Sequence, residues 1–356
     1  MSGRRDRDGR DGAGGDGGGG RAAGSGAEHG GSAMQPEPAL QAPWLAGPLA
    51  LLAAAADQDR VAHALLLHDA PGAGGALLAQ WLARRLLCTG PSRRPCGGCA
   101  ACRAVNEARH PDFLRLQPPE DSQQIRIEQV RELSAELALA SHQGGYKVVL
   151  IDPAEAMNRF AANALLKTLE EPPPRTVLML VTTQPSRLPA TVRSRCQCVR
   201  IRAPTRAQAL AWLGSTRAAD WEAVLDVVGN APLLAATFDP QQVAQLRAEV
   251  HSGLADLMAG SADAAHIAER WARAELPLRL NCLENWLTEC IRQRLGAGTY
   301  SVEMRGSTRP AAGDPVSNAR ALFELLERLR AFRAAAAATP VNRPLGLESL
   351  LRSLRA

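Results

Sequence analysis

Residues 147–202 read KVVLIDPAEAMNRFAANALLKTLEEPPPRTVLMLVTTQPSRLPATVRSRCQCVRIR, and this stretch decides the fold. It contains two apolar runs, 148–151 and 177–181, with the length and β-branched content of fully buried parallel strands. Between them, 160–171 has the apolar spacing of a helix, which a run of three prolines ends. The second strand leads to a loop that carries Ser194-Arg195-Cys196. This order predicts half of a nucleotide-binding α/β domain.

A second strand–loop–helix unit precedes this stretch. A short strand is expected up to His68, the loop 69–75 reads DAPGAGG, and a helix is predicted over 77–88. A functional phosphate loop has the pattern G-x-x-x-x-G-K-[ST], in which the lysine contacts the terminal phosphates and the hydroxyl binds magnesium. Gly72 and Gly74 occupy turn positions of that pattern. The unit therefore has the context of a nucleotide site.

The side chains that would use this context are missing. Gly75 and Ala76 replace the lysine and the hydroxyl residue, and Asp69, in place of the first glycine, would repel a phosphate. Nucleotide hydrolases of this type end the strand at 148–151 with Asp-Glu, which hold magnesium and activate water. The pair here is Asp152-Pro153, and proline cannot be a general base. We expect a domain without ATPase activity of its own.

Four of the eight cysteines follow the spacing C-x7-C-x2-C-x2-C. They are Cys88, Cys96, Cys99 and Cys102. Thiolates at this spacing suit a tetrahedral zinc ion, which would be structural because protein fills all four positions. Two alternatives remain open: unmetallated thiols, and an iron–sulfur cluster, whose common run continues x3-C-P, unlike the residues after Cys102. The other cysteines are expected to be buried small hydrophobes: Cys196, Cys198, Cys282 and Cys290.

Composition indicates a globular protein of two or three domains. The 356 residues are 46% hydrophobic and 22% charged, and the net charge of +5 is compatible with nucleic acid but too weak to prove it. No apolar run reaches the ~18 residues of a membrane span, and no signal peptide is visible, so a cytoplasmic location is expected. Residues 1–33 have almost no apolar side chains and should be disordered, with Met34 a possible start.

Several motifs occur in the order found in one protein family. They are His63-Ala-Leu-Leu66, the gapped glycine loop, the cysteine insertion, His110-Pro-Asp112, 163–173 (NALLKTLEEPP) and Ser194-Arg195-Cys196. This series resembles the AAA+ clamp-loader subunits of bacterial DNA polymerase III, strongly over 43–203 and more weakly beyond. The lysine, the hydroxyl residue and the Asp-Glu pair of the active gamma and tau subunits are absent. The resemblance is therefore to a subunit that does not hydrolyse ATP.

The resemblance implies an α/β plus all-α fold. Residues 34–203 would form an AAA+ RecA-like domain with a parallel sheet and a zinc module at 88–102. Residues 204–240 would form a small helical lid domain, and 241–356 a helical collar domain that packs against other subunits. Within the collar, the polar stretch 296–314 is expected to be a loop.

It also implies a place in a five-subunit arc with gamma/tau and delta, which opens the beta sliding clamp and loads it on primed DNA. ATP would lie between subunits, and a neighbour would supply an arginine in trans. By motif, Arg195 is that arginine, while the degenerate set of Gly72, Gly74, Gly75 and Asp152 would hold no ATP. The alternative is that Arg195 only caps the preceding strand or pairs with Glu170 or Glu171. Thr182 and Thr183, at the family's sensor position, are expected to be structural.

Glu170 and Glu171 occupy the last turn of the predicted helix, where the helix dipole disfavours negative charge. A cation should offset them, either Arg175 or a basic group across an interface. A solvated helix end remains the alternative.

Two other functions stay open. One is an active ATPase subunit of the gamma/tau type with an unusual phosphate loop. The other is a zinc-module protein that binds nucleic acid without partner subunits.

Overall fold

The structure, a computed structural model, describes residues 39–91, 94–119, 122–295, 319–338 and 341–355. Five strands form one sheet in the order β2-β3-β4-β1-β5, and every neighbouring pair is parallel. The strands are β1 (Ala64–His68), β2 (Phe113–Leu116), β3 (Lys147–Ile151), β4 (Thr176–Thr182) and β5 (Gln197–Arg200). The expected α/β architecture is confirmed, and both apolar runs of the deciding stretch are central strands.

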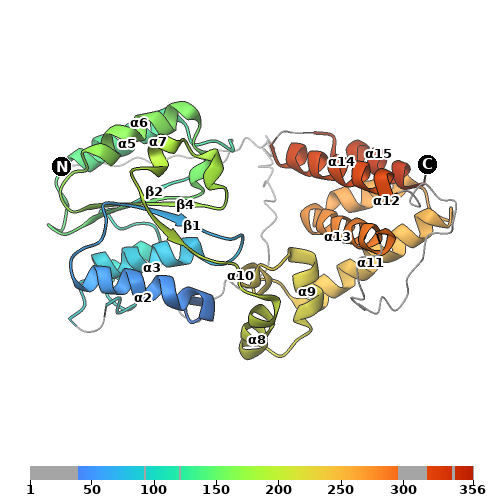
Figure 1. The fold of residues 1–356 in the computed structure, drawn as a ribbon, viewed down its shortest axis with the longest axis horizontal. Helices are drawn as coiled ribbons and strands as arrows, with labels where there is room; N and C mark the ends of the chain where they lie inside the picture. Colours follow the sequence, from blue (N-terminus) through green and yellow to red (C-terminus); the bar gives the residue numbers. More distant parts are fainter. Residues whose placement is uncertain (1–38, 92–93, 120–121, 296–318, 339–340, 356) are drawn as a thin grey trace, which may run out of the picture. The chain divides into compact units, whose positions relative to one another are not determined.

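Helices cover both faces of this sheet (Figure 1). On one face lie α2 (Ala46–Asp57), preceded by the turn η1 (Pro43–Leu45), and α3 (Gly75–Leu87); on the other lie α5 (Ile127–Ala138) and α6 (Arg159–Glu170). Successive side chains of a strand point to opposite faces, so Leu65 and Leu67 pack with α3 while Leu66 packs with α6. Burial on both sides explains why β3 and β4 are continuous apolar runs.

Local contacts fix the ends of α5 and α6. The side chain of Asn158 accepts a hydrogen bond from Ala161 N at 2.8 Å, which caps the N-terminus of α6. At the C-terminal end of α5, the buried ammonium of Lys147 donates to the carbonyls of Glu136 and Leu139 at 2.6 and 2.7 Å. A cation at this end also favours the helix dipole. Lys147 therefore joins the start of β3 to α5.

Short elements complete the α/β part. They are α4 (Ala100–Asn106), η2 (Ala154–Ala156), η3 (Pro185–Arg187) and α7 (Ala190–Arg193). The first follows the cysteine motif, and the last precedes Arg195.

From Arg206 onward the described chain is helical, as the sequence predicts. The helices are α8 (Arg206–Thr216), α9 (Trp221–Val228), α10 (Pro232–Ala235), α11 (Pro240–Met258), α12 (Ala264–Arg273), α13 (Leu276–Arg294), α14 (Ala319–Ala338) and α15 (Arg343–Arg355). In the described ranges, no helix is both long enough and apolar enough to span a membrane. The tail expected at 1–33 and the loop expected at 296–314 lie outside the described residues.

Candidate functional site

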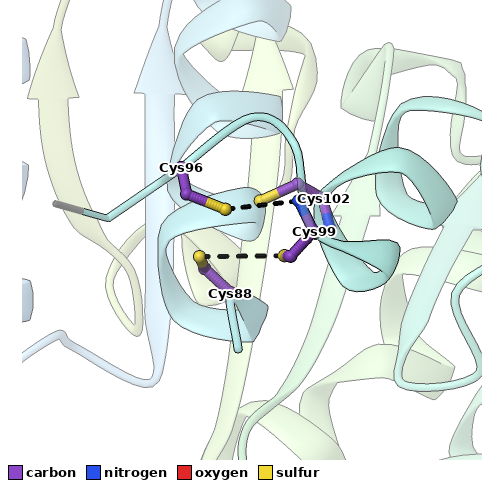
Figure 2. Close-up of side chains that lie close together, drawn as sticks. All are labelled: Cys88, Cys96, Cys99 and Cys102. Atoms are coloured by element: carbon purple, nitrogen blue, oxygen red, sulfur yellow. Dashed lines mark hydrogen bonds between the residues drawn. The ribbon is translucent and has the colours of Figure 1, made fainter. Parts of the chain in front are cut away.

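The four cysteines of the spaced motif converge on one point (Figure 2). Cys88 directly follows α3, Cys99 is the N-cap residue of α4, and Cys102 lies in its first turn. Their sulfur atoms, with that of Cys96, all lie within 4.8 Å of one another. The Sγ atoms of Cys88 and Cys99 are 3.9 Å apart. Tetrahedral zinc with Zn–S bonds of ~2.3 Å would separate its sulfur ligands by ~3.8 Å. The cluster therefore has the ligand set and spacing to bind a metal ion.

Backbone N–H groups turn toward these sulfur atoms. Gly90 N donates to Cys88 Sγ at 3.4 Å, Cys99 N to Cys96 Sγ at 3.3 Å and Cys102 N to Cys99 Sγ at 3.3 Å. A thiol sulfur is a weak acceptor, whereas a thiolate accepts charge-assisted bonds. The loop is thus built to hold thiolates.

The charges of the four thiols depend on one another. Burial would raise the pKa of Cys99, but hydrogen bonds from the backbones and side chains of Cys102 and Thr89 together lower it to about 5. Burial and the neighbouring Cys99 raise the pKa of Cys102 to about 12. Once one thiolate forms, ionising the next therefore needs a compensating cation.

The four cysteines outside this group were expected to be buried. Cys282 is buried as predicted, and Cys196 and Cys290 are only half-buried. The prediction was wrong for Cys198, which is exposed on the edge strand β5.

The degenerate phosphate loop is closed by its own chain. Gly75 N, the first N–H of α3, donates to Asp69 Oδ2 at 2.8 Å, and Ala73 N donates to Ala70 O at 2.9 Å. In an active loop such N–H groups bind phosphate oxygens. The carboxylate of Asp69 therefore occupies the position at the helix N-terminus where an anion would bind, in addition to repelling an anion.

Side chains from α10 and from the N-terminal turn cover this loop. A Cβ atom at Gly72, where φ is +68°, would lie 2.5 Å from Cβ of Ala231, and one at Gly74 would lie 2.6 Å from Leu233 Cδ1. The indole of Trp44 donates to Ala73 O at 2.8 Å. The glycines permit these close approaches, and Ala73 is fully buried. The space over the loop is occupied by apolar side chains of the same chain.

Three carboxylates lie near the carboxyl ends of β1 and β3. Burial raises the pKa of Asp69 to about 6, and Asp152 adds to the effect. Burial also raises the pKa of Asp152, against the favourable charge of Arg115. Burial would raise the pKa of Glu155, but hydrogen bonds that include those from Thr182 and Thr183 lower it overall.

Glu155 is a residue of this region that sequence reasoning missed. Its Oε1 accepts hydrogen bonds from Thr183 N at 3.2 Å and Thr183 Oγ1 at 2.9 Å. Glu155 therefore binds Thr183, one of the two threonines that the resemblance places at the family's sensor position. The available signal was an acidic residue two positions after Pro153, where the general base was sought.

Arg195 follows α7 and reaches the C-terminus of α6. Its Nη2 lies 2.6 Å from Glu170 Oε1, and its Nη1 donates to Thr191 O at 2.9 Å and to Ser194 Oγ at 3.4 Å. Within this chain, the cation beside Glu170 is thus Arg195 rather than Arg175. Arg175 lies 5.9 Å from the centre of the Tyr146 ring. The pairing with Glu170, an alternative at the sequence level, is present, and the arginine remains 36% exposed.

Comparisons with known proteins point in one direction. Residues 46–205 match the protein family described as DNA polymerase III, delta subunit. The chain is 40% identical to DNA polymerase III subunit delta' of Pseudomonas aeruginosa over 239 residues, which cover 66% of this chain and 73% of that protein. It is 35% identical to subunit delta' of Yersinia pestis over 273 residues, 73% of this chain and 79% of that protein. Subunit tau of Escherichia coli is 38% identical over 149 residues, 42% of this chain and 23% of tau.

Proposed function

This chain belongs to the family of DNA polymerase III delta-prime subunits, and from that premise we propose that it is a clamp-loader subunit that hydrolyses no ATP itself. It helps to load the beta sliding clamp onto primed DNA during replication. Its partners are the gamma/tau and delta subunits. The polymerase chemistry of the holoenzyme resides in another subunit.

One observation carries the claim that this subunit binds no ATP: the Gly75 N–H at the start of α3 is bonded to Asp69 Oδ2. A phosphate entering here would displace a carboxylate and would also meet Ala231 and Leu233. Neither Gly75 nor Pro153 can supply the missing lysine or base. A nucleotide would therefore find neither a positive charge to attract its phosphates nor enough space over the loop.

The catalytic contribution of the chain is Arg195, given in trans to the ATP of a neighbouring subunit. A guanidinium is planar and permanently charged, and it stabilises the charge that develops on a transferred phosphoryl group. Arg195 is partly exposed at the end of α7, where a neighbour can reach it. The sequence motif Ser194-Arg195-Cys196 and this exposure support the assignment.

We assign zinc as the ion of the cysteine cluster, with a structural role. Cys88, Cys96, Cys99 and Cys102 would hold it, and it would supply the positive charge that four neighbouring thiolates need. The ion would join the end of α3 to α4, a segment with little apolar core of its own. It takes no part in phosphoryl transfer.

We also propose the division into domains that the resemblance implies. Helices α8–α10 fall within the proposed lid domain at 204–240, while α11, which begins at Pro240, and α12–α15 form the described part of the proposed collar at 241–356. In the proposed lid, Ala231 and Leu233 would fill the space over the loop where a nucleotide would otherwise bind.

Equilibrium dialysis of the purified full chain with labelled ATP and magnesium tests the proposal. We expect no saturable binding up to millimolar ATP, while the chain still forms a complex with its host's gamma/tau and delta subunits. Micromolar, magnesium-dependent binding would instead favour an active ATPase of the gamma/tau type. Failure to join those subunits, combined with strongly salt-dependent DNA binding by the isolated chain, would favour a separate nucleic-acid-binding protein.

A further inference from the structure

We propose that Glu170 is the positioning residue for Arg195, holding its guanidinium in the orientation in which it meets the neighbouring subunit's ATP. This inference rests on the proposed function, because it assumes that Arg195 acts in trans.

Residues of α6 and α7 hold the Arg195 guanidinium from two sides. Glu170, the last residue of α6, holds Nη2 at 2.6 Å, while Thr191 O in α7 accepts from Nη1 at 2.9 Å and Ser194 Oγ lies 3.4 Å from it. Among the described residues, these contacts leave two of the five guanidinium N–H donors for an incoming anion. The contacts fix the plane of the group without using all of its donors.

The position of Glu170 is unfavourable without such a role. A negative charge at a helix C-terminus opposes the helix dipole, and no cation of α6 itself lies in ion-pair contact with Glu170. The compensating charge is Arg195, which is distant in sequence. A residue that breaks a local rule and is compensated by a functional side chain is expected at a functional site.

The ion pair between Arg195 and Glu170 can open, because both side chains are exposed to solvent. Arg195 is 36% exposed and Glu170 51% exposed, so solvent weakens their attraction. Such a pair restrains the many rotamers of a long arginine side chain, yet it does not prevent the guanidinium from engaging phosphate oxygens. Preorganisation of this kind lowers the barrier of the chemical step and leaves the affinity for ATP unchanged.

The test uses the complete clamp loader assembled with Glu170→Gln, a change that keeps the shape of the side chain and removes its charge. We expect kcat for ATP hydrolysis at the adjacent site to fall by about 5-fold, equivalent to about 1 kcal/mol of activation free energy. KM for ATP should not change. The free chain should keep its melting temperature, because the pair is exposed.

Glu171→Gln is the matched control, since it removes the same charge one residue further along without touching this ion pair, and it should leave kcat unchanged. The double variant Glu170→Gln, Arg195→Ala should hydrolyse ATP no more slowly than Arg195→Ala alone, because Glu170 acts only through Arg195.

Three results would overturn the inference, and they separate it from the proposed function. A normal kcat for Glu170→Gln, with a large loss for Arg195→Ala, would refute the positioning role and leave the trans-acting arginine intact. An equal loss in Glu171→Gln would show a general effect of charge. A normal kcat for Arg195→Ala would refute both proposals.

Discussion

Asp69 places a negative charge at the N-terminus of α3, where an active loop binds a nucleotide phosphate. Its Oδ1 is buried and has no hydrogen-bond partner in the described part of the chain. The N–H at the start of the helix donates to the other oxygen, Oδ2. Burial of the carboxylate still raises its pKa to about 6. One residue thus bonds to the backbone of the loop and, in the proposed function, also excludes the phosphate that such loops bind.

The raised pKa makes a prediction about stability. A carboxylate whose pKa is higher in the folded state than in the unfolded state destabilises the fold when ionised. This destabilisation is complete above about pH 6 and disappears as the pH falls toward the unfolded value of 3.8. Lowering the pH from 7.5 to 5 should therefore raise the Asp69 contribution to the free energy of unfolding of the wild-type chain by about 1 kcal/mol.

Asp69→Asn should lack this contribution while keeping an acceptor for Gly75 N. Urea unfolding at both pH values, with the two proteins at equal metal content, measures the difference. An identical pH dependence in both would contradict the assignment.

The elements of the α/β part were predictable because their signals are local. Apolar runs indicated β3 and β4, prolines indicated the end of α6, and the cysteine spacing indicated the cysteine cluster. The closure of the loop was not predictable, because it depends on Ala231 and Leu233, far along the chain, and neither residue carries a local signal. The burial expected for Cys198 failed because β5 lies at the edge of the sheet.

The cysteine cluster makes a prediction for the segment that joins α3 to α4. Cys96→Ser should lose the one equivalent of zinc that we assign to the wild-type chain and should lower its melting temperature, because metal binding contributes to folding. Cys198→Ser, a change at an exposed cysteine outside the cluster, is the control and should alter neither quantity. Metal analysis and thermal unfolding measure both effects. Tightly bound zinc and full thermal stability in Cys96→Ser would show that the assignment is wrong.

For the whole molecule, the proposal divides the chemistry of ATP hydrolysis between chains. The nucleotide site of this subunit is filled by Asp69 and by residues of α10, while Arg195 stays accessible at the end of α7. A subunit that cannot hydrolyse ATP can still control hydrolysis in the neighbouring subunit, because a trans-acting arginine can raise the rate by ~10³–10⁵-fold. In the proposed function, the fold thus serves as a fixed partner rather than as a motor.

The most direct test of this account is ATP hydrolysis by the complete clamp loader assembled with Arg195→Ala. Arg193→Ala, a change at the exposed arginine that ends α7 two residues before Arg195, is the matched control. We expect hydrolysis at the adjacent site to fall by about 10³-fold or more in Arg195→Ala. Assembly should remain intact, and Arg193→Ala should behave as wild type. Normal hydrolysis by a fully assembled Arg195→Ala complex would contradict the account.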